Sequence, residues 1–419
     1  MFFLCRHIAF FYKLEARGPL NSYTLGFPII ACLFDGAAMK SLLLLSIFPL
    51  ALLADELNFT RQTVDANIQI GYGLVVGHVD DDKRQDIIVA DKTEIVWYRN
   101  PGSAEAPWTK HVMARNLTAK DNVCVAARDI TGDGMVEVAV GANWNPGETK
   151  ETSTSGGSFY LKRPDDPTKP WAPVALPDHE PTTHRMHWLQ YEGKFALAVL
   201  PLHGVGNKGG DGKSVSIGLY EIVDETPKLV KRVDTSMHMT HNFETLTDPE
   251  LGEADFMLVA GKEGYMAALL SSDTLPIVDS SQSKGAGEVR RYPISSHAFV
   301  GIEPMHGTDV VIYRENSPGD WSRELIDGSL SQGHALAASN LLGSETPDIV
   351  AGWRGKNSDG KTGIKIYEAS NDGWKTHMLD DKIACEDIKL ADLDGNGKVD
   401  IIAAGRATKD VVIYWNSVE

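Results

Sequence analysis

The stretch LADLDGNGKVDIIAAGR, from Leu390 to Arg406, shows the pattern that organises the rest of the chain. Within it Asp392, Asp394 and Asn396 occupy alternate positions, and Asp400 follows at the ninth place. Ca²⁺ and Mg²⁺ require several oxygen ligands on a short flexible loop, and this spacing supplies them. Apolar runs typical of strands flank the loop and no helix pattern follows it, so the stretch predicts strand, acidic loop, strand rather than an EF-hand.

The same pattern recurs upstream at roughly 50-residue intervals, which is typical of a repeat built from four-stranded propeller blades. The copies are HVDDDKRQDIIVADK (His78–Lys92), DITGDGMVEVAVGANW (Asp129–Trp144) and SNLLGSETPDIVAGWR (Ser339–Arg354). The last copy lacks the middle ligand, whereas the first two keep their acids in register, at Asp80, Asp82 and Asp86 and at Asp129, Asp133 and Glu137. We expect Ca²⁺ or Mg²⁺ in the acidic loops; acidic surface turns without metal are the alternative.

A second phrase, led by tryptophan, fixes the order of strands within a blade. It occurs at Trp108, Trp321 and Trp374, with a weaker copy at Trp171, and each copy follows a strand-like run. We therefore expect it to be the fourth, outermost strand of a blade. The last blade lacks this strand after VVIYWN (Val411–Asn416), and LNFTRQTVD (Leu57–Asp65) supplies it. The pattern predicts an all-β, seven-bladed β-propeller in which the N-terminal strand closes the last blade.

The N-terminal part of the chain lies outside the blade pattern. Met39 and Lys40 precede an apolar run of about 14 residues that ends at Ala54, as in a secretory signal peptide. We expect residues 1–38 to be a non-native extension, 39–54 a signal peptide and 55–419 a secreted propeller; an unusual membrane anchor is the alternative. The glycosylation acceptors Asn58 and Asn116 fit secretion. Cys124 and Cys385 then remain, and we expect two buried thiols rather than a disulfide.

The net charge of the chain and the length of its N-terminal apolar run narrow the choice of partners. The formal net charge is −17, which argues against nucleic acid and anionic membranes and suits a small polar ligand. The apolar run is too short for a comfortable membrane span. A small sugar or glycan is the expected partner, and the sequence leaves a homodimer open.

Histidines, carboxylates, arginines and tryptophans gather at one end of the predicted ring. Innermost strands are expected to begin near Tyr72, Asn122, His184, His238, Glu288, His334 and Cys385, and the turns between second and third strands lie at the same end. That end collects His184, His187, Trp188, His203, His238, His241, Glu303, His306, His334, Trp353, Arg354, Glu386 and Arg406. Residues three apart on a regular strand face opposite sides, so one member of each His-x-x-His pair is expected in the loop before its strand. Any one of these histidines alone would be interpreted as a structural residue. Together they predict a polar or metal site in the channel.

Several of these phrases resemble the propeller domain of the fungal aldos-2-ulose dehydratase (1,5-anhydro-D-fructose dehydratase) family, within the FG-GAP/VCBS-type propellers. They are HRMHW, LPLHG, MHMTHNF, GAGEVR, IEPMHG, GHALA, AGWRG and AAGRAT…YWN, and the resemblance spans Leu57 to Asn416. It implies dehydration of 2-keto sugars such as 1,5-anhydrofructose, with divalent metals that include zinc and magnesium. Enzymes of that family continue into cupin-fold domains, to which their isomerase step is attributed, whereas this sequence stops at Glu419.

Dehydration of a 2-keto sugar requires a base, an acid and a cation that stabilises the enolate. We expect zinc in the channel, bound among His184, His187, His203, His238 and His241. His187 and His241 are also catalytic candidates, and Glu303, His306 or His334 would serve as base and acid. Arg354, Arg406 and Glu386 would bind sugar oxygens, and Trp188 or Trp353 would pack on the ring.

Two non-catalytic interpretations stay open. A secreted propeller with structural Ca²⁺ or Mg²⁺ loops would hold a glycan or protein at the same rim without turnover. A structural or adhesive module would bind protein partners and be indifferent to the rim histidines. No nucleophile elbow, phosphate loop or dinucleotide fingerprint is present in the sequence.

Overall fold

The computed structural model describes residues 57–207, 209–247, 255–270, 274–279, 283–294 and 297–418. The predicted extension and signal peptide lie outside the described residues. In the described part, every regular element is a strand, and no helix is long and apolar enough to cross a membrane.

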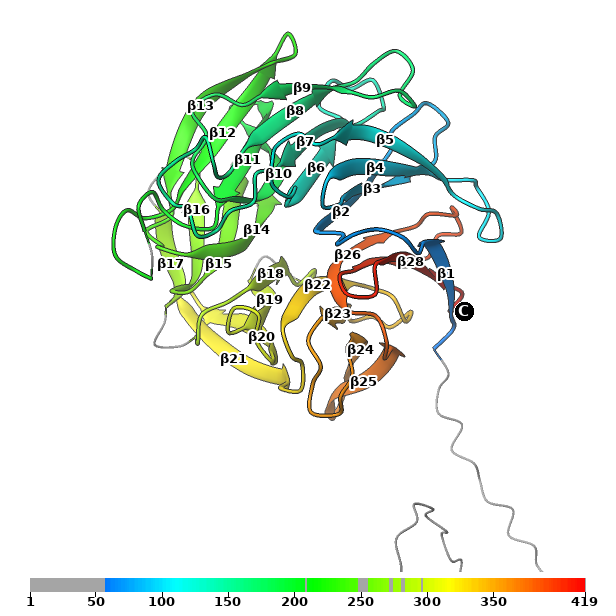
Figure 1. The fold of residues 1–419 in the computed structure, drawn as a ribbon. Coiled ribbons are helices and arrows are strands. Elements are labelled where there is room, and N and C mark those ends of the chain that lie inside the picture. Colours follow the sequence, from blue (N-terminus) through cyan, green and yellow to red (C-terminus); the bar gives the residue numbers. More distant parts are fainter. Residues whose placement is uncertain are drawn as a thin grey trace, which may run out of the picture. The chain divides into compact units, whose positions relative to one another are not determined.

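The strands form seven four-stranded antiparallel sheets arranged in a ring around a central axis (Figure 1). Blades 1 and 2 contain β2 (Gly73–Gly77), β3 (Asp86–Ala90), β4 (Glu94–Arg99) and β5 (Thr109–Arg115), then β6 (Cys124–Arg128), β7 (Glu137–Gly141), β8 (Ser158–Lys162) and β9 (Ala172–Ala175). Blades 3 and 4 contain β10 (Thr183–Tyr191), β11 (Lys194–Pro201), β12 (Ser216–Val223) and β13 (Thr226–Asp234), then β14 (Thr240–Thr247), β15 (Asp255–Gly261), β16 (Gly264–Leu269) and β17 (Thr274–Asp279).

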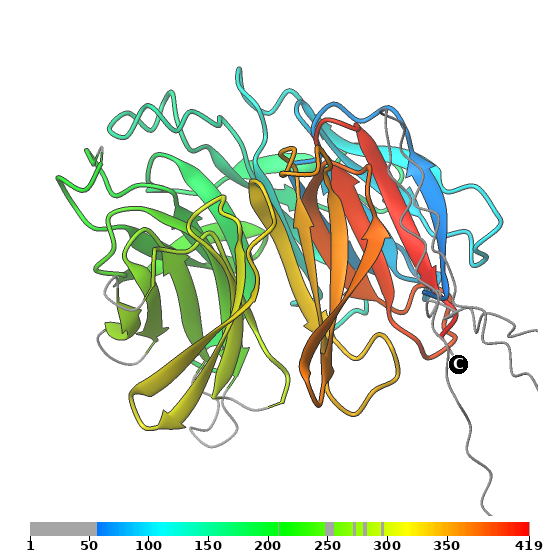
Figure 2. The ribbon, with the colours of Figure 1, turned by 90° about the horizontal axis from the view of Figure 1, so that it is seen from below.

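Blades 5 and 6 contain β18 (Glu288–Arg291), β19 (Ala298–Glu303), β20 (Asp309–Ser317) and β21 (Asp320–Asp327), then β22 (Gly333–Ser339), β23 (Asp348–Trp353), β24 (Gly363–Ser370) and β25 (Gly373–Asp380). Blade 7 contains β26 (Cys385–Ala391), β27 (Asp400–Gly405), β28 (Asp410–Asn416) and β1 (Phe59–Asp65). Figure 2 shows the blades from the side, with the loop between β7 and β8 extending from one end of the ring. The predicted all-β, seven-bladed architecture is confirmed.

The ring closes as predicted, because β1 pairs antiparallel with β28 and supplies the outer strand of blade 7. The side chain of Gln62 reinforces this closure: its amide oxygen accepts hydrogen bonds from the indole of Trp415 at 3.0 Å and from that of Trp108 at 3.4 Å. One β1 residue thus ties blade 7 to blade 1. Pairing also covers the backbone edge of β28, which would otherwise be open to other chains.

Apolar side chains from facing blades fill the space between neighbouring sheets. Between blades 1 and 2, for example, Trp97 and Met113 pack with Val125, Val138 and Trp171. The middle strands are buried on both faces and read as continuous apolar runs, as in β3 and β27. Cys124 and Cys385 lie within these cores as free, buried thiols, so the prediction of two thiols and no disulfide between them is confirmed.

The last acidic position of each loop pattern is a structural clamp. Asp400 is fully buried, and its two carboxylate oxygens accept backbone N–H groups from Leu393 at 2.9 Å and from Asn416 at 2.8 Å. The acid therefore ties the loop before β27 to the end of β28. Asp86 does the same in blade 1, with the N–H groups of Val79 and Asn100.

Replacing Asp400 with asparagine should lower the free energy of unfolding by roughly 1–3 kcal/mol, because an amide NH₂ would face one of two buried backbone donors. Urea denaturation would measure the change. Asp372→Asn, in an exposed turn between the third and fourth strands of blade 6, is the matched control. Equal stability of the two variants would contradict a clamping role.

A partly buried carboxylate links blades 5 and 6. Asp327 accepts hydrogen bonds at 2.8 Å from the Tyr367 hydroxyl and the Lys365 ammonium. Burial opposes ionisation of Asp327, but hydrogen bonds from Lys365, Ser329 and Tyr367 outweigh it and hold the pKa below the ordinary 3.8. A depressed folded-state pKa means that the stabilisation is complete above about pH 4 and is lost as the pH falls through the folded-state value.

Asp327→Asn should therefore destabilise the protein by roughly 1–3 kcal/mol at pH 7, with a smaller difference from the parent at pH 3. Chemical denaturation at both pH values would measure it. A difference that stays constant between pH 7 and pH 3 would show that ionised Asp327 contributes nothing to the link.

Candidate functional site

Four inner strands carry a β-bulge near their first residue, at the end of the ring where the histidines gather. The pairing register shifts between Thr183 and Arg185, Thr240 and Asn242, Gly333 and Ala335, and Cys385 and Asp387. The four unpaired bulge residues are His184, His241, His334 and Glu386. A bulge re-aims side chains by adding one residue to a strand, so the predicted rim chemistry is presented by bulges.

The bulges also correct the expectation for the first His-x-x-His pair. His184 and His187 both lie within β10, because the bulge changes the phase of the strand between them. The expected loop position holds only for the second pair, in which His238 precedes β14 and His241 is the bulge.

Three histidines from neighbouring blades bring ligand nitrogens together. In the group His241, His306 and His334, one ring nitrogen from each lies within 4.8 Å of the other two. The Nε2 atoms of His241 and His306 are 2.8 Å apart. His306 comes from the turn after β19, where its φ of 53° turns the backbone sharply. The cluster therefore joins blades 4, 5 and 6 at the channel.

The Nδ1 atoms of the bulge histidines are held by backbone carbonyls. His241 donates to the carbonyl of Gly287 at 2.8 Å, and His334 donates to that of Glu386 at 2.7 Å. His184 donates in the same way to the carbonyl of His241 at 2.7 Å. Fixing Nδ1–H leaves the Nε2 lone pair as the available electron pair, which is the arrangement typical of metal-binding histidines.

Burial keeps these histidines neutral. It lowers the pKa of His306 to about 3, with the charges of His241 and Arg354 acting in the same direction. Burial also moves the pKa of His334 well below its ordinary value, and the nearby guanidinium of Arg354 adds to the shift. For His241 burial again lowers the pKa, although the carboxylate of Glu288 opposes it. Neutral imidazoles can bind a metal near pH 7 without first losing a proton.

Two arginines and an indole border the cluster. Arg354 Nη1 lies 2.8 and 2.7 Å from the two oxygens of Glu386, and Arg406 Nη1 lies 2.8 Å from one of them. The predicted trio of Glu386, Arg354 and Arg406 is therefore brought together, and the backbone carbonyl of Glu386 is the one that holds His334. Trp144 stacks on His184 with ring centroids 5.1 Å apart, and it is the aromatic side chain at the cluster.

The prediction that Trp188 or Trp353 packs on a sugar ring is wrong. Trp188 is 4% exposed and lies in the core between blades 2 and 3. Trp353 is fully buried between blades 5 and 6, where its indole donates to the carbonyl of Lys361 at 2.9 Å. Burial leaves neither ring a face for a ligand.

Glu303 is also misassigned as an acid or base. It is fully buried, and its carboxylate contacts the Tyr313 hydroxyl and the Arg323 guanidinium, both at 2.8 Å. Those partners lie on β20 and β21, the outer strands of blade 5, so this carboxylate serves the blade interior.

Of the other predicted metal ligands, His184 lies beside His241 with ring centroids 4.7 Å apart but outside the three-histidine group. The remaining three lie apart from the group. His238 lies with Nδ1 3.1 Å from a carboxylate oxygen of Glu263, and His203 forms an isolated bridge with Met239. His187 packs edge-on against Phe243, with ring centroids 4.7 Å apart, and lines a pocket in the channel. Among the described residues, none of these three belongs to a group with metal-ligand spacing.

The acidic loops differ in how their charge is balanced. In blade 1, Arg99 lies 2.5 Å from Asp80 and 3.7 Å from Asp82. In blade 2, Arg163 pairs with Asp133 and lies 3.6 Å from Glu137, while both oxygens of Asp129 accept backbone N–H groups. In blade 7, oxygens of Asp392, Asp394 and Asp400 lie within 4.8 Å of one another, and Asn396 donates to Asp394. Side-chain cations occupy the first two loops, so the blade 7 loop keeps the geometry closest to a cation site.

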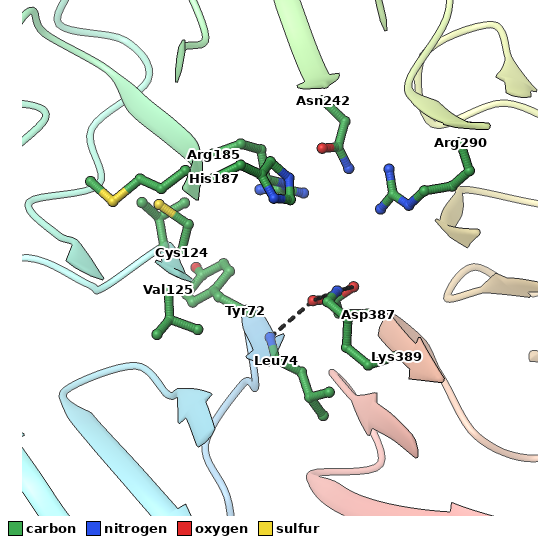
Figure 3. Close-up of a pocket in the computed structure, with 13 residues that line it drawn as sticks. Tyr72, Leu74, Cys124, Val125, Arg185, His187, Asn242, Arg290, Asp387 and Lys389 are labelled. Atoms are coloured by element: carbon green, nitrogen blue, oxygen red, sulfur yellow. Dashed lines mark hydrogen bonds and ion pairs between the residues drawn. The ribbon is translucent and has the colours of Figure 1, made fainter. Parts of the chain in front are cut away.

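Apart from His187, the residues of a pocket deeper in the channel were not predicted from the sequence as site residues. The pocket there is lined by Arg185, His187, Asn242, Arg290, Asp387 and Lys389, together with Tyr72 and small or apolar residues (Figure 3). Alternation along the inner strands was the available signal, because Arg185 and His187, and likewise Asp387 and Lys389, are two positions apart.

Comparison with known proteins supports the architecture. No protein-family model and no curated protein matches the chain. A chain of the crystal structure of the mitotic checkpoint complex matches with a TM-score of 0.57 and 12% identity, over 94% of this chain and 99% of that one. A chain of the crystal structure of BBS1N in complex with ARL6DN, soaked with mercury, matches with a TM-score of 0.55 and 12% identity, over 86% of this chain and 96% of that one. The same complex soaked with lead matches with a TM-score of 0.56 and 12% identity over the same shares of the two chains. The chain is a seven-bladed β-propeller. Identity at this level shows the fold alone.

Proposed function

We propose that this propeller is a secreted, zinc-dependent dehydratase that acts on a 2-keto sugar at the channel end. The observation that supports it best is the group of His241, His306 and His334, whose neutral imidazoles converge from three blades. Three histidine ligands with a fourth position open are typical of catalytic zinc. The resemblance of the histidine phrases to the aldos-2-ulose dehydratase family supplies the substrate class.

The residues around the cluster suit the chemistry. Zinc bound by the three histidines would supply a Lewis acid for the developing enolate. His184 is the remaining buried histidine beside them. Its Nδ1 donates to a carbonyl, so Nε2, which lies 3.1 Å from Arg185 Nη1, is the atom that would take a proton once Arg185 turns away. Arg354 and Arg406 offer donors for sugar oxygens, and the half-buried indole of Trp144 offers an apolar wall beside His184.

The test is a metal analysis combined with a substrate assay on the purified propeller, residues 55–419. We expect about one zinc per chain, from the single three-histidine group, and an ultraviolet-absorbing enone from 1,5-anhydrofructose. The product should disappear when a chelator removes the metal and return when zinc is added. Zinc without product would reject the dehydratase and leave a sugar-binding propeller.

A second candidate is a non-catalytic secreted propeller that binds a glycan or protein. The observation that favours it is the blade 7 loop, where three carboxylates gather in the manner of a structural Ca²⁺ or Mg²⁺ site. Calcium or magnesium without zinc, combined with saturable glycan binding and no enone, would select this candidate.

A further inference from the structure

The channel contains a second polar site, next to the histidine cluster and deeper along the inner strands. Arg185 and His187 follow the His184 bulge, Asn242 follows the His241 bulge, and Arg290 lies two residues after Glu288. Figure 3 shows the side chains of Arg185, His187, Asn242 and Arg290 converging on one open space, with Asp387 and Lys389 opposite. Nitrogen atoms from several blades therefore face a common pocket.

The charges around the pocket favour a negative ligand. Three cations line it, Arg185, Arg290 and Lys389, against one carboxylate, Asp387. Asp387 is already engaged: Lys389 lies 2.7 and 2.9 Å from its oxygens, and the N–H of Leu74 donates to it at 2.9 Å.

Carboxylates that face the pocket from behind its lining are also engaged. Glu288 accepts from the amide of Asn242 at 2.5 Å and lies 3.4 Å from Arg290. Glu244 accepts the N–H of Arg291, and burial raises its pKa, which favours its neutral form. Burial also lowers the pKa of Lys389, so the guanidinium groups of Arg185 and Arg290 are the permanent cations of the lining.

The guanidinium groups keep donors for a ligand. Arg185 contacts His184 through one nitrogen, Nη1, which lies 2.9 Å from the carbonyl of His184 and 3.1 Å from its Nε2. Arg290 donates through Nη1 to the carbonyl of Val289 at 2.5 Å and through Nη2 to Glu288 at 3.4 Å, one contact for each terminal nitrogen. A guanidinium has five N–H donors in a fixed planar fork, a shape that matches carboxylate and phosphate oxygens.

We propose that this pocket binds a small oxyanion, a carboxylate or a phosphate, between Arg185, Arg290 and Lys389, with the Asn242 amide as a further donor. The site is separate from the three-histidine group and does not depend on it. An oxyanion would accept hydrogen bonds from the two guanidinium groups and balance their charge inside the pocket.

Arg185 also couples the two sites, a consequence that rests on the proposed metal centre. Its Nη1–H shares the Nε2 lone pair of His184. A cation arriving beside His184 repels Arg185 and favours its turning toward the pocket, where an oxyanion would receive it. Binding of the oxyanion and of zinc should therefore be mutually favourable, because coupling between two ligands is reciprocal.

The test is calorimetric titration of the metal-free protein with sodium acetate and, separately, with inorganic phosphate. We expect saturable binding of at least one of them, at least roughly tenfold weaker in Arg290→Gln and in Lys389→Met. The preferred anion identifies the oxyanion as carboxylate or phosphate. Arg128→Gln removes an exposed arginine at the far end of β6 and is the control.

Two results would overturn the site: no saturable binding by the parent protein, or binding that both variants and the control retain equally. The parent titration decides the question even if a variant fails to fold. A second titration measures zinc affinity with and without acetate, where tighter zinc binding with acetate supports the coupling. If the parent protein binds the anion but does not bind zinc, the proposed metal centre is rejected and the anion site is retained.

Discussion

Replacing His334 with alanine, or His306 with asparagine, should reduce zinc affinity by more than roughly 100-fold, beyond the effect typical of changes around a metal site. Each substitution removes one of the three ring nitrogens that lie within 4.8 Å of one another. Asparagine is chosen at position 306 because it tolerates the positive φ found there better than alanine does. Competition with a chromophoric zinc chelator would measure the affinities.

The matched control is His377→Ala. His377 lies on β25, an outer strand, where it contacts the carboxylate of Glu368 at 2.8 Å, far from the channel-lining strands. It removes one imidazole without touching the cluster, so its zinc affinity should equal that of the parent. Zinc retained by both cluster variants would show that the histidines are held together for structural reasons alone.

Deleting β1, residues 59–65, should lower the melting temperature by more than about 10 °C and increase self-association. The deletion removes the whole partner of β28 and the Gln62 contacts to Trp415 and Trp108, which together are worth several kcal/mol. It also exposes an apolar edge strand, β28, whose residues are buried in the closed ring. Thermal unfolding and sedimentation velocity would measure both effects.

A synthetic peptide that covers residues 57–67 tests whether the loss arises from the missing strand. Added in excess, it should restore the melting temperature by pairing with β28, whereas a scrambled peptide of the same composition should not. A deletion variant as stable as the parent would mean that β1 contributes little to closure.

The fold was predictable because its signals are local and repeated. Each acidic loop lies between two apolar runs, and each tryptophan-led phrase marks an outer strand, so β5, β21 and β25 were placed from a few residues each. The closing strand followed from counting, since blade 7 lacked its fourth strand. Repetition compensates for the weakness of any one short strand signal.

The site was predicted less well, because its geometry depends on strand phase. Trp188 follows His187 directly, and neighbours on a strand face opposite sides, so alternation already places Trp188 in the core when His187 faces the channel. Trp353 and Arg354 show the same relation at the end of β23. The prediction for Trp188 and Trp353 rests on their proximity to the rim and conflicts with this alternation.

Bulges were the part that sequence could not supply. Nothing in the sequence around His184, His241 or His334 distinguishes a bulge from a regular strand. A bulge is set by the register in which the strand pairs with its neighbour, and the sequence does not show this register. The sharp turn at His306 is equally hidden, since histidine seldom adopts a positive φ. The residues of the cluster were therefore selected, but their division between metal binding and acid–base roles was not.

The bulges have a consequence for how such a ring can change over evolution. A residue in a regular strand pairs with a residue on the next strand and packs its side chain against the core, so a substitution affects both contacts. A bulge residue has no cross-strand partner, and the same position holds histidine in three blades and glutamate in a fourth. Mutations there can exchange imidazole for carboxylate while the stacked sheets stay intact. The channel chemistry of this protein is thus free to diverge faster than the framework that carries it.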